Sequence, residues 1–221
     1  MTTTEGPPRG AGRVEGGCTL TFDDGPDSEW TPRVLAELDR CEARATFFVI
    51  GARVDCAPEL AHAAVDRGHD VELHCDRHVR HTELTDRELE DDTRSGLLAL
   101  ERAGLPRPTR WRPPWGICSE ASPRVAVEQG LELVGWTIDT HDWRGDASAE
   151  MLEAAGSGIE DGAIVLMHDA LGPGARRQGV GETVGLIGPL CALARGQGLR
   201  VVSLSQEARA RAAPRRLGAP G

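Results

Sequence analysis

Short apolar runs alternate along the chain with longer stretches in which apolar residues recur at helical spacing. The runs predict strands at Cys18–Phe22, Ala45–Ile50, Asp70–Leu73, Thr109–Arg112, Leu131–Ile138, Ala163–Met167 and Leu199–Leu204. The stretches between them predict helices over residues 29–42, 57–67, 85–103, 119–129, 147–156 and 182–196. Strands that alternate with helices indicate an α/β protein with a parallel sheet in a single domain.

The alternation alone fits a closed barrel and an open, doubly wound sheet equally well. No G-x-G-x-x-G motif follows the first predicted strand, which argues against a dinucleotide-binding fold and favours a (β/α) barrel of about seven parallel strands. Residues 17–206 are the predicted catalytic domain. The Gly- and Pro-rich segment 1–16 and the basic segment 207–221 are expected to be flexible or disordered.

Charge and composition narrow the class of protein. The 221 residues contain 25 Lys plus Arg and 35 Asp plus Glu, a formal net charge of −10, so nucleic acid is not an expected partner. The longest apolar runs, such as Ala163–Met167, are too short to span a membrane. The chain starts without the basic and apolar stretches of a secretory signal, which predicts a cytoplasmic protein whose six cysteines are reduced.

Acidic, imidazole and guanidinium groups gather just beyond the ends of the predicted strands. In a parallel β/α barrel these carboxyl ends form one rim, so groups far apart in the sequence converge there. The groups are Asp23 and Asp24 after the first strand, His74 after the third, Arg112 at the end of the fourth, Asp139 after the fifth and His168 after the sixth. Their convergence predicts a functional site on that rim.

Two segments of this rim hold candidate metal ligands. His74 and His78 are four residues apart, which on a helical turn places both imidazoles on one side, a spacing that suits a zinc-like ion. Asp24 can supply a third ligand, and two histidines with one carboxylate leave positions open for water and substrate. Its neighbour Asp23 can then face the bound water. The alternative is that residues 24–26 only form a turn.

Two further segments carry candidate catalytic groups. The prolines in W-R-P-P-W-G at 111–116 fix the backbone, so the N–H of Trp115 has a set direction, as an oxyanion site requires. The alternative there is a buried Trp-Pro plug with Arg112 in a salt bridge. His168 leaves an apolar strand on the same rim, which favours a catalytic histidine over a structural one.

Taken together, five segments resemble the motifs of the polysaccharide deacetylase family, also known as the NodB-homology group or carbohydrate esterase family 4. The resemblance extends over about residues 18–205, nearly the whole chain. It rests on TFDDGP at 21–26, HCDRH at 74–78, RPPWG at 112–116, DTHDW at 139–143 and LMH at 166–168, which follow one another in the family's order.

The resemblance implies an incomplete or distorted (β/α) barrel that binds a divalent metal, usually Zn²⁺, with Co²⁺ or Ni²⁺ as alternatives. The implied reaction is hydrolysis of an N-acyl group, with N-acetyl the expected one. The implied metal ligands are Asp24, His74 and His78. The other implied roles are Asp23 as general base, His168 as general acid, Arg112 as the residue that orients Asp23, Asp139 as the residue that tunes His168, and the Trp115 N–H as an oxyanion donor.

Departures from the family pattern bear on the substrate. Leu73 precedes the first histidine, Cys75 follows it, and Trp115 replaces a tyrosine, a bulkier ring that is expected to narrow or reshape the pocket. Short predicted loops, no signal segment and the negative charge favour an amino sugar or small N-acylated metabolite as substrate. The alternatives are an extracellular-type chitin or peptidoglycan deacetylase, an O-acetyl esterase on the same site, and a non-catalytic metal- or sugar-binding protein.

Overall fold

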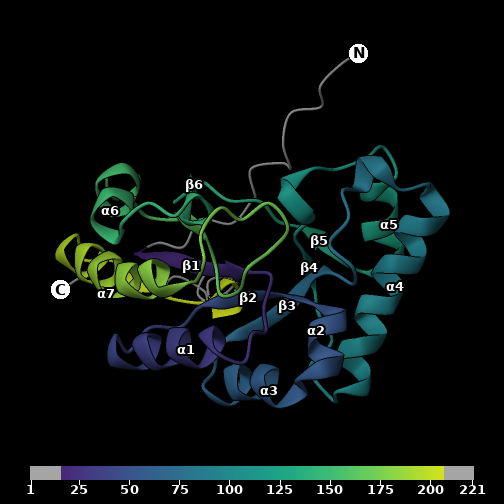
Figure 1. The fold of residues 1–221 in the computed structure, drawn as a ribbon, viewed down its shortest axis with the longest axis horizontal. Helices are drawn as coiled ribbons and strands as arrows, with labels where there is room; N and C mark the ends of the chain where they lie inside the picture. Colours follow the sequence, from purple (N-terminus) through teal and green to yellow (C-terminus); the bar gives the residue numbers. More distant parts are fainter. Residues whose placement is uncertain (1–15, 207–221) are drawn as a thin grey trace, which may run out of the picture.

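Strand β1 (Gly17–Asp23) is central to the fold because all of its side chains are buried. The computed structural model describes residues 16–206. In it β1 lies inside the sheet, with other strands on both sides (Figure 1). Leu20 and Phe22 belong to the main apolar core, whereas Thr21 and Asp23 lie on the other face, because side chains alternate along a strand. This alternation sends the last carboxylate of β1 towards the inside of the curled sheet.

Every pairing between the described strands is parallel. The other strands are β2 (Thr46–Ile50), β3 (Asp70–Cys75), β4 (Arg110–Trp111), β5 (Glu132–Leu133), β6 (Ile138–Asp139), β7 (Ile164–His168) and β8 (Arg200–Val201). Their order in the sheet is β5-β4-β3-β2-β1-β7-β6, and β8 pairs with the first residues of β1. Among these strands β5 and β6 do not pair with each other, so the sheet is a curled half-barrel, which confirms the predicted fold class.

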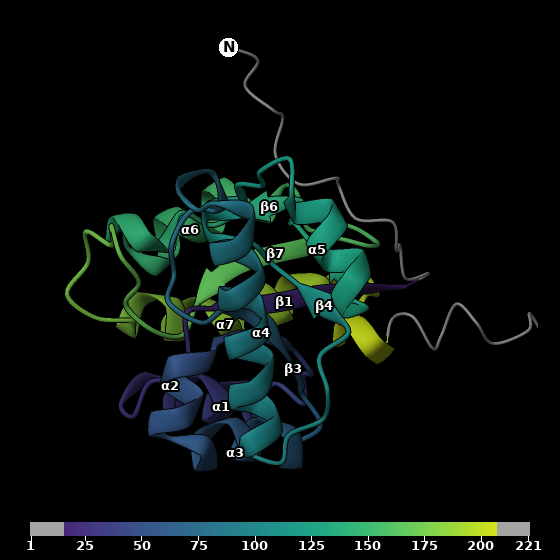
Figure 2. The same cartoon turned by 90° about the vertical axis from the view of Figure 1, so that its right-hand side faces the viewer.

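Helices cover the outside of the half-barrel. They are α1 (Trp30–Arg40), α2 (Gly51–Cys56), α3 (Pro58–Asp66), α4 (Asp86–Arg102), α5 (Ser122–Gln129), α6 (Ser148–Gly156) and α7 (Gly181–Gly196). Neighbouring helices contact one another in the order α6-α7-α1-α3-α2-α4-α5, so they follow the curl of the sheet (Figures 1 and 2). Three short 3₁₀ helices, η1 (His81–Glu83), η2 (Pro114–Gly116) and η3 (Asp142–Arg144), interrupt the loops.

One predicted strand is wrong. The apolar run Leu131–Ile138 forms two short strands at opposite ends of the sheet, β5 beside β4 and β6 beside β7. The residues between them cross from one end of the sheet to the other, and Val134 packs with Phe48, Ile164 and Leu204 in a small separate apolar cluster. The run is apolar because it is buried along this crossing, and a pattern of burial does not distinguish a crossing from a strand.

The remaining predicted strands and helices are present with shifted ends, and α2 is an additional helix. It was not predicted because it starts directly after β2, without a turn residue that would separate the two elements. Segments 1–15 and 207–221, which hold the predicted flexible ends, lie outside the described residues. Within residues 16–206, no helix has the length and apolar character needed to cross a membrane.

Candidate active site

A pocket of about 370 Å³ opens at the carboxyl ends of the central strands. Seven of the eight predicted site residues line it: Asp23, Asp24, His74, His78, Trp115, Asp139 and His168. The eighth, Arg112, is fully buried and reaches Asp23 with its guanidinium group. The rim of the parallel sheet thus brings the predicted residues together, as this architecture requires.

Asp24, His74 and His78 form a compact group of potential metal ligands. The Oδ1 atom of Asp24 is 3.4 Å from Nε2 of His74 and 3.0 Å from Nε2 of His78. The three ligand atoms lie within 4.8 Å of one another. The predicted helical turn between the histidines is wrong, since His74 lies in β3 and His78 lies in the following loop with a φ of 52°. The left-handed backbone of His78 turns its ring back towards His74.

The chemistry of this group fits a divalent cation. The Nδ1 atom of His74 is 2.6 Å from the carbonyl oxygen of Arg112, so an Nδ1–H donor leaves the Nε2 lone pair free to bind a metal. Asp24 Oδ1 is buried, and no described residue gives it a hydrogen bond of good geometry. Burial favours the neutral acid, yet His74 and His78 hold the pKa of Asp24 well below its usual value. A charged carboxylate and two imidazoles are ligands that zinc prefers.

Cys75 does not belong to this group. Its sulfur accepts a hydrogen bond from the backbone N–H of His78 at 3.0 Å, and burial raises the pKa of the thiol well above its usual value. The neutral thiol therefore helps to shape the loop that carries His78. Three ligands with an open side towards the pocket match a catalytic metal site better than a closed structural one.

Asp23 is held by Arg112. The guanidinium donates a hydrogen bond from Nη1 to Asp23 Oδ1 at 2.8 Å, and the same nitrogen contacts Thr21 Oγ1 at 2.7 Å. Its Nη2 donates to the carbonyl oxygen of Gly135 at 2.8 Å. Arg112 thus makes the contact expected of the residue that orients Asp23. It binds one carboxylate oxygen and leaves the second oxygen of Asp23 free to face the pocket. The salt bridge of Arg112, which the sequence offers as an alternative to a catalytic role for this segment, is made with Asp23. It therefore also positions the predicted base.

Trp115 also lines the pocket and lies in η2 with a φ of 55° and a ψ of 10°. Its ring contacts His78 edge-on, with centroids 4.3 Å apart, and the guanidinium of Arg80 lies 4.3 Å from the ring centroid. Proline residues on its N-terminal side fix the backbone direction. The ring of Trp115 therefore lies beside the metal-ligand group, and the role of its N–H as an oxyanion donor stays a prediction.

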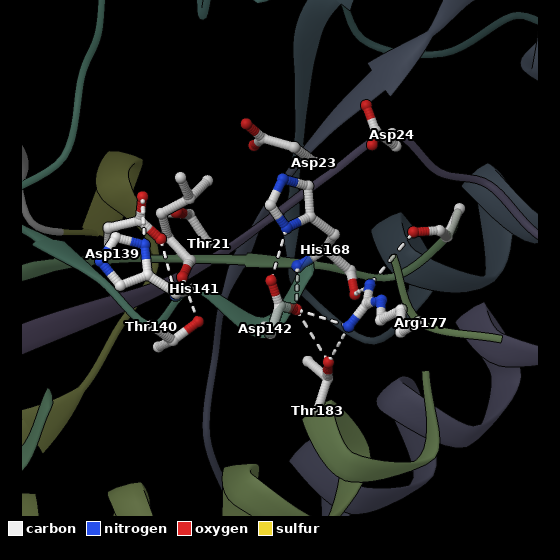
Figure 3. Close-up of polar contacts among 12 residues, drawn as sticks. Thr21, Asp23, Asp24, Asp139, Thr140, His141, Asp142, His168, Arg177 and Thr183 are labelled. Carbon is white, nitrogen blue, oxygen red and sulfur yellow. Dashed lines mark hydrogen bonds and ion pairs between the residues drawn. The ribbon is translucent and has the colours of Figure 1, made fainter. Parts of the chain in front are cut away.

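The predicted residue that tunes His168 is Asp139, but the carboxylate that contacts this histidine in the structure is Asp142. The Nδ1 atom of His168 is 2.7 Å from Asp142 Oδ1, and the His168 backbone N–H donates to Asp142 Oδ2 at 3.0 Å. Asp139 instead accepts the backbone N–H of His141 and lies 3.1 Å from the Nδ1 atom of that ring. Figure 3 shows the two pairs side by side, with His168 directed towards Asp23 and Asp24.

The physical reason is the turn after β6. His141 adopts a left-handed conformation and starts η3, which turns the chain so that Asp142 lies under His168 while Asp139 stays in the strand. Burial lowers the pKa of His168, but the charge of Asp142 outweighs it and raises the pKa to about 9. Burial likewise raises the pKa of Asp142, but His168 and Arg177 outweigh it and lower the pKa to about 2. The pair is therefore an imidazolium beside a carboxylate at neutral pH.

Two residues without a predicted role complete this pair. Arg177 donates from Nη1 to Asp142 Oδ2 at 2.9 Å, and Thr183 donates to the same oxygen at 2.8 Å (Figure 3). Arg177 also donates from Nη2 to the carbonyl oxygens of His168 and Ala170, both at 3.2 Å. Arg177 thus fastens the loop after β7 to the carboxylate. Nothing in the sequence pattern indicates this, since the arginine follows a Gly- and Pro-rich loop and resembles a solvated residue.

A third residue that the sequence analysis missed is Arg53 of α2. Its guanidinium donates to the carbonyl oxygens of Asp24 at 2.9 Å and Leu171 at 2.8 Å, and so joins the loop after β1 to the loop after β7. The latter loop approaches the metal ligands closely, because a Cβ atom on Gly172 would lie 1.9 Å from Asp24 Oδ2. Only glycine fits at this position without displacing the carboxylate.

Comparison with known proteins places this site in a family. Residues 13–134 match the polysaccharide deacetylase family. The chain is 38% identical over 154 residues to the peptidoglycan-N-acetylglucosamine deacetylase of Listeria monocytogenes. This alignment covers 68% of this chain and 32% of the Listeria protein. It is 36% identical over 160 residues to a chitooligosaccharide deacetylase of a Bradyrhizobium strain, which covers 72% of this chain and 73% of the relative.

A solved structure gives the same result. The family 4 carbohydrate esterase of Streptomyces lividans, in complex with acetate, is similar with a TM-score of 0.76 and 29% identity, over 85% of this chain and 92% of that one. This chain spans about a third of the length of the Listeria protein. The matched residues, the half-barrel and the five motifs agree, and the chain belongs to the polysaccharide deacetylase family.

Proposed function

We propose that this protein is a metal-dependent deacetylase that hydrolyses N-acetyl groups on the amino sugars of an oligosaccharide or polysaccharide. One observation carries the proposal: a carboxylate held by Arg112 and an imidazolium held by Asp142 lie in one pocket with the Asp24, His74 and His78 group. Binding of a sugar or a metal alone requires neither a positioned base nor a positioned acid. The non-catalytic alternative is therefore disfavoured.

The residues divide the work of amide hydrolysis. Asp24, His74 and His78 would hold a divalent ion, with Zn²⁺ preferred over Co²⁺ or Ni²⁺, that polarises the acyl carbonyl and lowers the pKa of water. Asp23, oriented by Arg112, accepts the proton of the attacking water. The N–H of Trp115 donates a hydrogen bond to the acyl oxygen as it gains charge.

Departure of the amine requires a separate acid. An amine leaves readily only when it is protonated, and Asp23 has already served as base on the water side. His168 has a pKa raised to about 9, chiefly by Asp142 against the opposing effect of burial, and so carries a proton at neutral pH. Asp142 holds Nδ1 of the ring, which leaves Nε2 directed towards the pocket to donate this proton (Figure 3).

A sugar polymer is a better candidate substrate than the small metabolite favoured by the sequence analysis. The two relatives are named for peptidoglycan and chitooligosaccharide, which supports the polymer alternative. The rim also presents Trp115, a residue that is 37% exposed, as a surface on which a sugar ring can stack. Amide and ester hydrolysis share their tetrahedral intermediate, so the O-acetyl esterase stays the second candidate.

Acetate release is the experiment that tests the proposal. The full chain, loaded with Zn²⁺, is incubated with three compounds. They are N-acetylglucosamine, its fully N-acetylated β-1,4-linked tetramer (here called chitotetraose) and an O-acetylated xylo-oligosaccharide. We expect release from chitotetraose that chelation abolishes and that exceeds release from the monosaccharide. Release only from the O-acetyl compound would replace the deacetylase by the esterase. A metal-loaded chain that binds chitotetraose but releases no acetate would support the non-catalytic alternative.

A further inference from the structure

Two arginines beside the catalytic pocket lack an acidic partner. Among the arginines of residues 16–206, only Arg144, Arg176 and Arg200 make neither an ion pair nor a hydrogen bond with their guanidinium groups, although acidic residues outnumber basic ones in the chain. Arg144 and Arg176 are both exposed and share one aromatic neighbour. Their guanidinium carbons lie 5.2 Å and 5.6 Å from the ring centroid of Trp143. Two positive charges close to one indole repel each other, and a bound anion would offset this repulsion.

These arginines line a hollow that adjoins the catalytic pocket. The hollow has a volume of about 380 Å³, and Arg144, Arg176, Arg177 and Gln178 contribute to its wall. Arg177 lines both cavities, and Trp143, whose ring lies near Arg144 and Arg176, lines the catalytic pocket, so the hollow adjoins that pocket. A sugar whose N-acetyl group enters the catalytic pocket therefore has neighbouring groups within reach of this arginine hollow.

The acidic residues of the hollow do not neutralise it. Asp142 is occupied by His168, Arg177 and Thr183. Glu182 accepts the backbone N–H of Ser148 at 2.8 Å and forms no ion pair with either arginine. The side chain of Arg177 is buried, and its Nε has no hydrogen-bond partner in the described chain. The hollow thus offers unused guanidinium donors, whose planar geometry suits carboxylate and phosphate groups.

We propose that Arg144, which follows Trp143 in η3, and Arg176, whose backbone N–H donates to the Trp143 carbonyl oxygen, bind an acidic substituent of the substrate. This deepens and rests on the proposed function. The substituent is a carboxylate or a phosphate on a sugar next to the one that loses its acetyl group. The substrate class is accordingly an acidic glycan, and a neutral chitin-like chain is the poorer substrate.

The test compares matched substrates on the Zn²⁺-loaded full chain. Neutral chitotetraose is set against a tetrasaccharide of alternating N-acetylglucosamine and N-acetylmuramic acid, against the methyl ester of that tetrasaccharide, and against chitotetraose bearing phosphate esters. We expect kcat/KM to be about tenfold higher for an acidic compound than for its neutral counterpart, through a lower KM. Preference for the carboxylate or for the phosphate compound tells the two anions apart. Equal values for all four compounds would overturn the subsite.

Variants assign the effect to these residues. The double variant Arg144→Gln/Arg176→Gln is expected to lose the preference for the acidic compounds and to keep the rate on neutral chitotetraose within about twofold. Arg200→Gln is the matched control, because this third unpartnered arginine pairs in β8 with the opposite end of β1 from Asp23. A double variant that retains the full preference would assign the effect elsewhere and overturn the proposal.

Binding separates this proposal from the proposed function. In an Asp23→Asn background the substrates survive, so calorimetry can compare the Kd of the acidic and neutral tetrasaccharides with and without the two glutamines. Tighter binding of the acidic compound without any acetate release from the wild type would overturn the deacetylase and leave the subsite standing. Acetate release with equal Kd and kcat/KM values for acidic and neutral compounds would support the deacetylase and overturn the arginine subsite.

Discussion

The two halves of the catalytic pocket are built in different ways. The ligand half, Asp24 with His74 and His78, comes from the end of β3 and the loops that follow β1 and β3, and both histidines contact Asp24 directly. The acid half depends on a chain of contacts, in which Arg177 and Thr183 hold Asp142 and Asp142 holds His168. Damage to the ligand half should therefore remove the metal altogether, whereas damage to the acid half should change the rate by degrees.

The largest effect is expected from His78→Ala. Loss of one of three ligands should reduce bound Zn²⁺ to a small fraction of one ion per chain and reduce acetate release by roughly a thousandfold or more. Elemental analysis after dialysis measures the metal. His62→Ala is the control, since that ring contacts a carbonyl oxygen of Ala103 at 2.8 Å outside the pocket. A His78→Ala protein that still binds one Zn²⁺ per chain would show that His78 is not a metal ligand.

Asp23→Asn should separate the base from the ligands. The amide can still accept the hydrogen bond from Arg112 but cannot take a proton, so kcat should fall by roughly 10²–10⁴-fold while the metal content stays near that of the wild type. Metal analysis and kcat are measured on the same preparation. Loss of the metal in this variant would mean that Asp23 and Asp24 have exchanged roles.

The pair Asp142→Asn and Asp139→Asn tests the acid half. His168 must be protonated to act as acid, so activity should fall as pH rises through its pKa of about 9. Asp142 raises this pKa, and its replacement should move the alkaline limb of the pH–rate profile to lower pH and reduce kcat by roughly 10²-fold. Asp139→Asn should leave the limb in place. A shift in the Asp139 variant alone would restore the pairing predicted from the sequence.

Gly172→Ala tests the close approach of the loop after β7 to the ligand half. The added Cβ would lie 1.9 Å from Asp24 Oδ2, so the ligand must move, and the affinity for Zn²⁺ should fall by roughly 10–100-fold. Competition with a chromophoric chelator measures that affinity. Gly196→Ala is the control, because a Cβ there meets no atom within 4 Å. Unchanged affinity in the Gly172 variant would show that the loop after β7 can move away without disturbing the ligand half.

The smallest effect is expected from Arg177→Lys. The lysine keeps a charge near Asp142 but cannot also reach the carbonyl oxygens of His168 and Ala170. We expect kcat on neutral chitotetraose to fall roughly three- to tenfold, with KM unchanged and bound metal intact. Arg177→Met should fall further and should also alter the alkaline limb of the pH–rate profile. If both variants match the wild type in rate and pH profile, Asp142 holds His168 without help from this arginine.

Site residues at the end of a strand can be placed from the sequence. Asp23, Asp24 and His74 sit at the ends of buried apolar runs, so the parallel sheet alone brings them together. Asp139 and Asp142 show the limit, because the turn at His141 decides which carboxylate reaches His168, and nothing in residue spacing reveals a left-handed residue there.

Long-range contacts set a second limit. The run Leu131–Ile138 is apolar throughout but crosses from β5 to β6, since burial by a crossing segment and by a strand gives the same pattern. The roles of Arg53 and Arg177 depend on which carbonyl and carboxylate oxygens come near them after folding. An arginine in a polar stretch carries no signal of such contacts.

Metal-dependent deacetylation is tested most directly by titrating the metal-free chain with Zn²⁺ while acetate release from chitotetraose is recorded. We expect no release before addition, a linear rise, and a plateau at about one ion per chain. Release that is independent of added metal, or a fully loaded chain that releases no acetate from any N-acetylated oligosaccharide, would contradict the assignment of this pocket.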